Sequence, residues 1–165
     1  MTNEVVFDSS FLLPIFSQNL RNEPSEKYYD QINYCFEQLV KEKTKIVIPT
    51  PALSEFLVRA EQAGQEYLRI IRAKSVFRIV PFKINAAVEV AQMSKKAIEQ
   101  GDKKSGSIQP WQKIKIDRQI IATAKVIRAK AIYSNDEDLR KFAKQVGLNT
   151  ISPEDLPLPR EPSLL

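Results

Sequence analysis

Short apolar runs alternate along this chain with longer segments of helical periodicity, and this alternation limits its fold more than any other feature. The runs expected to be strands are 4–7 (EVVF), 45–49 (KIVIP), 76–80 (VFRIV), 131–134 (AIYS) and 148–151 (LNTI). Helices are expected at 9–16, 24–43, 50–60, 64–74, 84–100, 116–129 and 136–146. Strands that are apolar throughout are buried on both faces, which is typical of a parallel sheet. We therefore predict an α/β domain of three layers, α/β/α, with a central parallel sheet of four to five strands.

The length of 165 residues suits a single domain, and no internal repeat is present. Four prolines follow Ser152 and predict an extended tail. We assign residues 1–155 to the domain and residues 156–165 to a Pro-rich C-terminal tail. No apolar run approaches the ~18 residues of a transmembrane helix, and the early run lacks the basic lead-in of a signal peptide. A cytoplasmic protein without membrane contact is expected.

The residues that the chain lacks narrow its possible chemistry. It has no histidine, a single cysteine and four glycines. Catalytic triads, zinc sites built on histidine or cysteine, phosphate-binding loops and dinucleotide fingerprints are therefore excluded. An enzyme of this composition would rely on carboxylates, hydroxyls, lysine, arginine or tyrosine. Carboxylates favour a hard ion such as Mg²⁺ or Mn²⁺.

The net charge of +5 is unevenly distributed. Acidic and basic side chains balance over residues 1–102, so the whole positive excess lies in residues 103–165. This asymmetry indicates a polyanionic partner. The alternative is a basic protein whose charge only keeps it soluble.

Four acidic residues stand near the ends of expected elements. Ligands of open α/β sheets bind beyond the carboxyl ends of the strands. Asp8 ends the first strand, Asp136 follows the fourth strand, and Glu55 lies in the first turns of the helix after the second strand. These three are expected at one edge of the sheet. Asp117 would open a helix over 116–129, and a short straight helix there would place it near the opposite edge.

Each of these acids also has a purely structural interpretation. Asp8 could cap the helix that follows it, and Glu55 could be a solvated helix residue. Asp117 could face the dipole at a helix start. Asp136 lies in a stretch where Ser134 and Glu137 could form a capping box, although a cap does not prevent an acid from binding metal. Spacing alone therefore leaves a carboxylate cluster plausible.

Three segments resemble the motifs of PIN-domain proteins. VVFDSSFLL resembles the family's opening strand, with Asp8 followed by the hydroxyl of Ser10. PALSEFL is similar to the segment with the family's internal acid, here Glu55. IDRQIIATAKVIRAKAIYSNDEDL resembles the most specific segment, which supplies Asp117, Ser134 and Asp136. The similarity covers residues 4 to about 155 in the family's order and is closest to VapC-like toxins of toxin–antitoxin pairs.

The resemblance implies that Asp117 does reach the site and that the protein is a metal-dependent ribonuclease. Asp8, Asp117 and Asp136 would ligate Mg²⁺ or Mn²⁺, with Glu55 as a ligand or as the group that orients the attacking water. Ser10 and Ser134 would hold the carboxylates in place. Lys115 and Arg118 would contact the RNA backbone.

The resemblance also implies an antitoxin partner and a homodimer. The helix over 24–43 carries Tyr28, Tyr29, Tyr34 and Phe36, more aromatics than one buried stripe requires, and such residues suit interfaces. Ordinary packing against the sheet is the alternative.

Two other functions compete with the nuclease. A non-catalytic RNA-binding or complex-assembly module would keep the fold, but it would not need all four acids. A phosphatase with Asp8 as a covalent nucleophile usually carries a second Asp two positions on, where this chain has Ser10.

Overall fold

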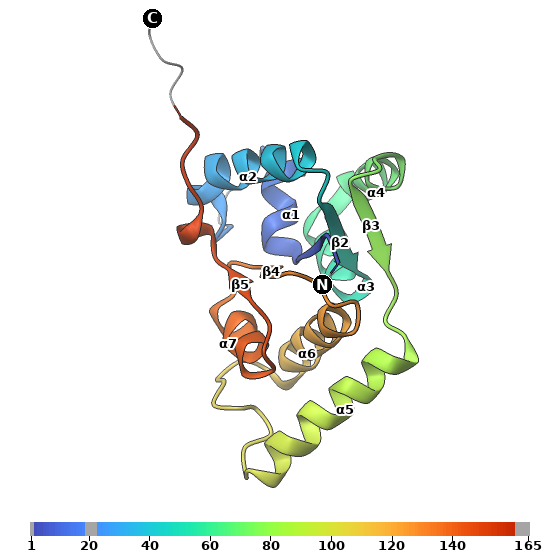
Figure 1. Ribbon diagram of the computed structural model, residues 1–165, viewed down its shortest axis with the longest axis vertical. Coiled ribbons are helices and arrows are strands. Elements are labelled where there is room, and N and C mark those ends of the chain that lie inside the picture. Colours follow the sequence, from blue (N-terminus) through green and yellow to red (C-terminus); the bar gives the residue numbers. More distant parts are fainter. Residues whose placement is uncertain (1, 19–22, 161–165) are drawn as a thin grey trace, which may run out of the picture.

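The chain forms one parallel sheet between layers of helices, as Figure 1 shows for a computed structural model that describes residues 2–18 and 23–160. The strands are β1 (Glu4–Phe7), β2 (Lys45–Pro49), β3 (Phe77–Val80), β4 (Ile132–Tyr133) and β5 (Thr150–Ile151). Their order across the sheet is β3-β2-β1-β4-β5, and every neighbouring pair is parallel. The predicted fold class is therefore confirmed.

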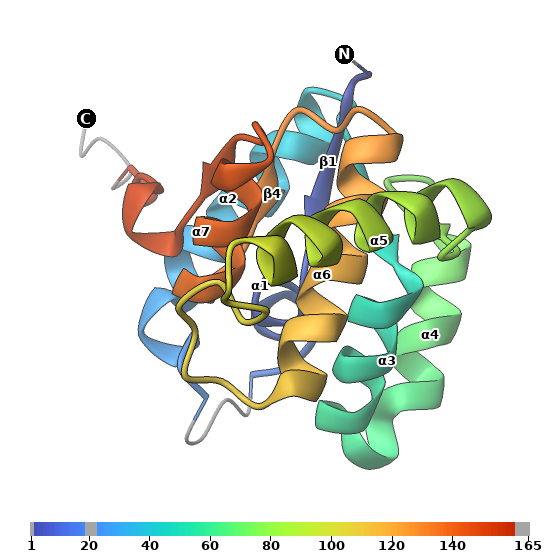
Figure 2. The same ribbon diagram turned by 90° about the horizontal axis from the view of Figure 1, so that it is seen from below.

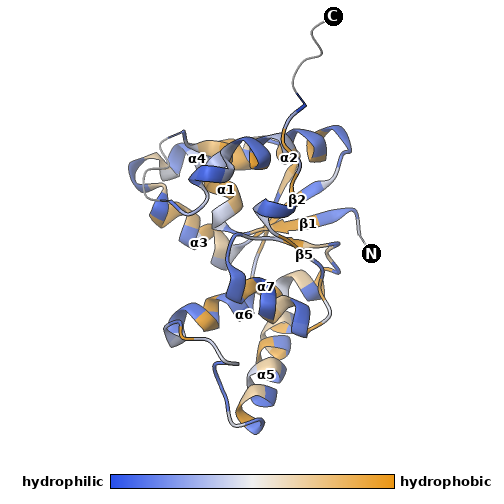
Figure 3. Cartoon of the chain, turned by 90° about the vertical axis from the view of Figure 1, so that its left-hand side faces the viewer, coloured by the Kyte–Doolittle hydropathy of each residue, from blue (hydrophilic) through white to orange (hydrophobic). Residues whose placement is uncertain are grey.

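Helices cover both faces of this sheet (Figure 3). The helices in chain order are α1 (Ser9–Phe16), α2 (Tyr29–Lys41), α3 (Thr50–Arg59), α4 (Gly64–Ala73), α5 (Ile84–Glu99), α6 (Trp111–Val126) and α7 (Glu137–Gln145). Short 3-10 turns occur at Glu26–Tyr28, Glu61–Ala63 and Pro153–Asp155. Helix α3 contacts α1 in one layer and α6 in the other, so it links the two sides of the domain.

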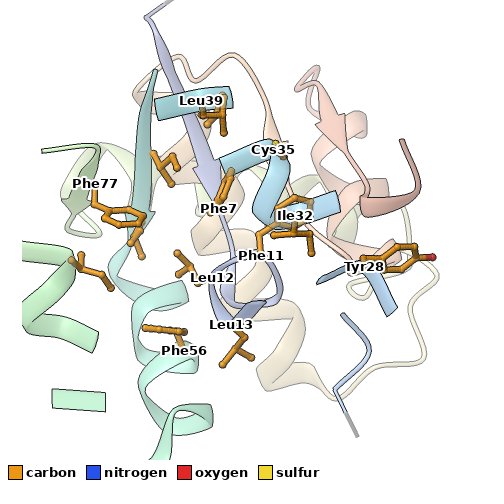
Figure 4. Close-up of a cluster of buried hydrophobic side chains, with 14 residues drawn as sticks. Phe7, Phe11, Leu12, Leu13, Tyr28, Ile32, Cys35, Leu39, Phe56 and Phe77 are labelled. Atoms are coloured by element: carbon orange, nitrogen blue, oxygen red, sulfur yellow. The ribbon is translucent and has the colours of Figure 1, made fainter. Parts of the chain in front are cut away.

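Successive residues of the central strands alternate between two buried clusters. Phe7 and Ile46 join the cluster under α1 and α2, whereas Val6 and Val47 join the cluster under α6 and α7. In Figure 4, Phe7, Phe11 and Ile32 lie together in the first cluster. Side chains of neighbouring strand residues point to opposite faces, so both faces must be covered.

The aromatic residues near α2 serve mainly the interior. Tyr28 is buried and donates a hydrogen bond to Glu154 Oε1 at 2.8 Å. Tyr29 and Phe36 pack against the first cluster, and only Tyr34 is half-buried without such packing. The interface interpretation of these aromatics is therefore not supported, because packing accounts for three of the four.

Several element boundaries differ from the expected ones. Helix α1 continues through Pro14 to Phe16, although a proline at its sixth position lacks the backbone N–H that would bond to the carbonyl of Ser10. The segment after Ser152 is not simply extended, since Pro153–Asp155 forms a 3-10 turn with a capping box. Helix α7 ends as expected before Gly147, which has a φ of 82°. Residues 161–165 of the predicted tail lie outside the described residues. Within the described ranges, no helix has the length and hydropathy required to cross a bilayer.

Candidate active site

The first part of the site lies where β1 and β4 end side by side. Phe7 pairs with Tyr133 in the parallel ladder, so the residues that follow them, Asp8 and Ser134, leave the sheet together. Asp8 also begins α1: its carboxylate accepts the backbone N–H of Ser10 at 3.0 Å. The helix-cap interpretation of Asp8 is thus correct, and it is compatible with a place in the site.

Two hydroxyls hold the Asp8 carboxylate. Ser10 Oγ donates to Oδ1 at 2.5 Å, and Ser134 Oγ donates to Oδ2. The hydroxyls are themselves held by backbone donors, since Asn135 N bonds to Ser10 Oγ and Asp136 N bonds to Ser134 Oγ, both at 2.9 Å. The orientation of this buried carboxylate is therefore fixed by residues from both strand ends.

Asp136 begins α7 and faces the same region. Its Oδ1 accepts the backbone N–H of Leu139 at 3.1 Å, so Asp136 itself is the helix cap. The expected capping box of Ser134 and Glu137 does not form, because the Ser134 hydroxyl is engaged by Asp8 and Asp136. The second carboxylate oxygen, Oδ2, faces the site and lies 3.1 Å from Lys113 Nζ.

Asp117 lies at the same edge of the sheet, and the expectation of the opposite edge is wrong. Helix α6 begins at Trp111, five residues before the predicted start at 116. A helix that feeds a parallel strand ends where that strand begins, so its own start lies at the carboxyl edge. Asp117 occupies the second turn of α6 and is only 1% exposed.

Lys113, which the sequence analysis did not single out, lies among the carboxylates. It precedes Asp117 by one helical turn and forms an ion pair with Asp117 Oδ1. Its Nζ is 3.1 Å from Asp136 Oδ2 and 3.9 Å from Glu55 Oε1. The i,i+4 spacing could have revealed this residue, but a helix predicted to start at 116 excluded it.

Burial raises the pKa of three carboxyl groups of the site, those of Asp8, Glu55 and Asp117, despite the nearby cation. The pKa of Asp117 is raised to about 7, because burial outweighs the contact with Lys113. Burial also raises the pKa of Asp8, although the serine hydroxyls oppose it. The pKa of Glu55 is raised by burial, and the charge of Asp8 adds to this effect. The Lys113 ammonium therefore does not offset the effect of burial on these three acids.

The oxygen ligands that the four acidic side chains offer are of the kind that a hard divalent ion prefers. All four groups are carboxylates, and Asp117 Oδ2 is buried without a hydrogen-bond partner in the structure. Among the residues that the structure describes, however, no three acidic groups converge into a ready-made metal cluster. The Lys113 ammonium, which contacts three of the acids, lies where their oxygens would have to meet.

The site opens into a cleft of about 580 Å³. The functional side chains that line it are those of Asp8, Ser10, Glu55, Arg59, Lys113 and Asp136. Arg59, which the sequence did not indicate as a site residue, lies one helical turn after Glu55. It donates a hydrogen bond to Ser9 Oγ at 2.9 Å and forms an ion pair with Glu23. The cleft is thus lined by both acidic and basic side chains.

The two basic residues expected to bind RNA are placed differently. Lys115 is exposed on α6, but its position two residues from both Lys113 and Asp117 turns it away from their face of the helix. Arg118 is 3% exposed and donates to Ser94 Oγ at 3.2 Å and to the Lys103 carbonyl at 2.5 Å. A guanidinium held in this way is not placed to contact an RNA backbone, so the prediction for Arg118 is not supported.

Arg118 fastens the loop between α5 and α6, which Figure 2 shows running to the start of α6. We expect Arg118→Met to lower the free energy of unfolding by about 2–4 kcal/mol, because the acceptors lose a buried charged partner. Urea denaturation would measure the loss. Lys115→Met is the matched control and is expected to change stability by less than about 0.5 kcal/mol. Equal stability of the two variants would contradict this role.

Comparison with known proteins agrees with the geometry. The sequence model of the family described as "PIN domain" matches residues 5–145. A search among curated proteins yields no match.

Solved structures of toxin complexes share the fold. A DNA-bound VapBC from Salmonella typhimurium has 16% identity and a TM-score of 0.59, with 91% of this chain and 98% of that chain covered. FitAB bound to a DNA fragment has 18% identity and a TM-score of 0.62, covering 94% and 99%. VapC20 of Mycobacterium tuberculosis, described as a sarcin–ricin loop cleaving toxin, has 13% identity and a TM-score of 0.55, covering 87% and 95%. With a family match over most of its length and this shared fold, the chain belongs to the PIN domain family.

Proposed function

We propose that this protein is a metal-dependent endoribonuclease that hydrolyses RNA phosphodiester bonds with Mg²⁺ or Mn²⁺. The observation that carries the proposal is that Asp8, Glu55 and Asp136, from separate elements, line one cleft, and that the buried Asp117 joins them through its ion pair with Lys113. Packing alone would not bring four like charges together, because burial of each carboxylate costs stability. A site that accepts this cost has a use for negative charge, and binding of a divalent cation is such a use.

The residues of the site have different proposed roles in the reaction. A bound divalent ion supplies a Lewis acid for the phosphate and lowers the pKa of a water ligand. Asp8, Asp117 and Asp136 would hold the ion, and Ser10 and Ser134 fix the orientation of the Asp8 carboxylate. Glu55, half-buried on the wall of the cleft, is suited to orient the attacking water. With no histidine in the chain, proton transfer falls to carboxylates and water.

We further propose that the protein is the toxin of a toxin–antitoxin pair. Support comes from the fold shared with VapBC and FitAB, which were solved as complexes on DNA, and with the cleaving toxin VapC20. An antitoxin protein is the proposed partner. A homodimer remains a prediction of the resemblance, and a cytoplasmic location remains a prediction from the sequence.

The test is cleavage of a purified structured RNA at pH 8. We expect fragments with Mg²⁺ or Mn²⁺ and none with excess chelator, since the carboxylates alone supply no electrophile. Hydrolysis by a metal-activated water leaves no cyclic phosphate, so fragments should carry 5′-phosphate or 3′-phosphate ends without a 2′,3′-cyclic product. Undiminished cleavage in chelator, or cyclic phosphate ends, would contradict the proposal.

A further inference from the structure

Lys113 is the one described cation that touches three of the site's acids. Its Nζ contacts Asp117 Oδ1 and lies 3.1 Å from Asp136 Oδ2 and 3.9 Å from Glu55 Oε1. These acids come from α6, from the start of α7 and from α3, so a single ammonium ties three elements together. Arg59, the other cation of the cleft, is engaged by Ser9 and Glu23.

The ammonium and a divalent ion would compete for the same oxygens. An ion ligated by Asp117 Oδ1 and Asp136 Oδ2 would need the atoms that Lys113 now contacts, and two cations cannot share them at short range. Lys113 is able to leave, because its side chain is 30% exposed, lines the cleft and has four rotatable bonds. Asp117, at 1% exposed, cannot turn to solvent instead.

We propose that the Lys113 ammonium is a displaceable internal cation, which holds the carboxylates together without metal and must be displaced when a divalent ion binds. The inference rests on the proposed function, because it assumes that these carboxylates bind the ion. Lys113 is here a positioning residue that sets the concentration of metal at which the site fills. Removal of the Lys113 ammonium leaves the negative charge of the carboxylates unbalanced, so the carboxylates are expected to bind a divalent ion more tightly.

The experiment is calorimetric titration of Mn²⁺ into chelator-treated full-length protein at pH 8, where competition from protons is small. Lys113→Met is compared with the native chain and with Lys115→Met, which removes the same charge from the same helix but about 200° round its axis. We expect Lys113→Met to bind Mn²⁺ roughly 10-fold more tightly or better. Lys115→Met should bind within about twofold of the native chain.

A second measurement tests the proposal even if the Lys113→Met variant does not fold without metal. Thermal melting followed by circular dichroism is recorded with and without Mn²⁺ for Lys113→Met and for Lys113→Gln, which keeps a polar group at the same place. Metal-free melting below that of the native chain, with a larger gain on adding Mn²⁺, supports the proposal. This outcome includes a variant that folds only when Mn²⁺ is present.

The contrary outcomes separate the two claims. If the native chain binds Mn²⁺ and Lys113→Met binds it equally or more weakly, the internal-cation inference is wrong and the metal site stands. If neither the native chain nor any variant binds Mn²⁺, the proposed metal-dependent function fails and the inference fails with it.

Discussion

Replacement of Asp117 by Asn is expected to lower the rate of RNA cleavage about 1000-fold while the domain stays folded. The substitution keeps the shape of the side chain but removes the charge of its oxygens, one of which is buried without a partner. Loss of several kcal/mol of electrostatic stabilisation corresponds to this factor in rate. Single-turnover cleavage with saturating enzyme and Mn²⁺ would measure it.

The matched control for this variant is Asp30→Asn, which changes an exposed acid in the first turn of α2. We expect its rate to stay within about twofold of the native rate, because surface substitutions away from a site have small effects. Circular dichroism would establish that both variants are folded. A purified and folded Asp117→Asn protein with full activity would remove Asp117 from the site.

The second large effect concerns stability without metal: the free energy of unfolding is expected to fall as the pH rises from about 4 to about 7. The pKa of Asp117 is about 7 in the folded chain, against an ordinary value of 3.8. Between these values the native state binds more protons than the unfolded state, so raising the pH favours unfolding. Asp117 alone accounts for at most about 4 kcal/mol, and Asp8 and Glu55 shift in the same direction.

The cation of the site does not alter the sign of this dependence. Burial lowers the pKa of Lys113, but Asp117, Asp136 and Glu55 outweigh burial and raise it above the ordinary 10.5. Lys113 therefore stays charged throughout the window, and its contribution is lost only at higher pH. Urea denaturation in chelator at pH 5, 6, 7 and 8 would give the slope. Asp117→Asn should flatten it, and a native stability that rises over this window would contradict the shift.

The strands were the most predictable part of the fold. The predicted strands EVVF and KIVIP coincide with β1 and β2. Strands that are buried on both faces are recognised from their continuous apolar runs. The weaker signal lies at helix starts. Helix α6 begins at Trp111. Gln112 and Lys113 are polar and begin no apolar stripe, so the periodicity of the sequence predicts a start only at 116.

That single boundary explains most of what the sequence did not reveal about the site. Asp8, Glu55 and Asp136 could be placed from strand ends, since the topology of a parallel sheet brings them to one edge. Lys113 precedes the predicted helix, so the sequence did not indicate its contact with Asp117. The burial of Arg118 depends on how the loop after α5 folds back, which is a tertiary contact that local periodicity does not encode.

The pairing of β1 with β4 has a consequence for the synthesis of this protein. Asp8 and the Ser134 hydroxyl that holds it are 126 positions apart in the chain. A ribosome must therefore release nearly the whole domain before the two strand ends can meet, and closing so long a loop is slow compared with forming α1 or α2. A nascent or truncated chain that stops before β4 lacks Asp136 and the second hydroxyl on Asp8. The proposed site is thus completed only after β4 and the start of α7 have been synthesised.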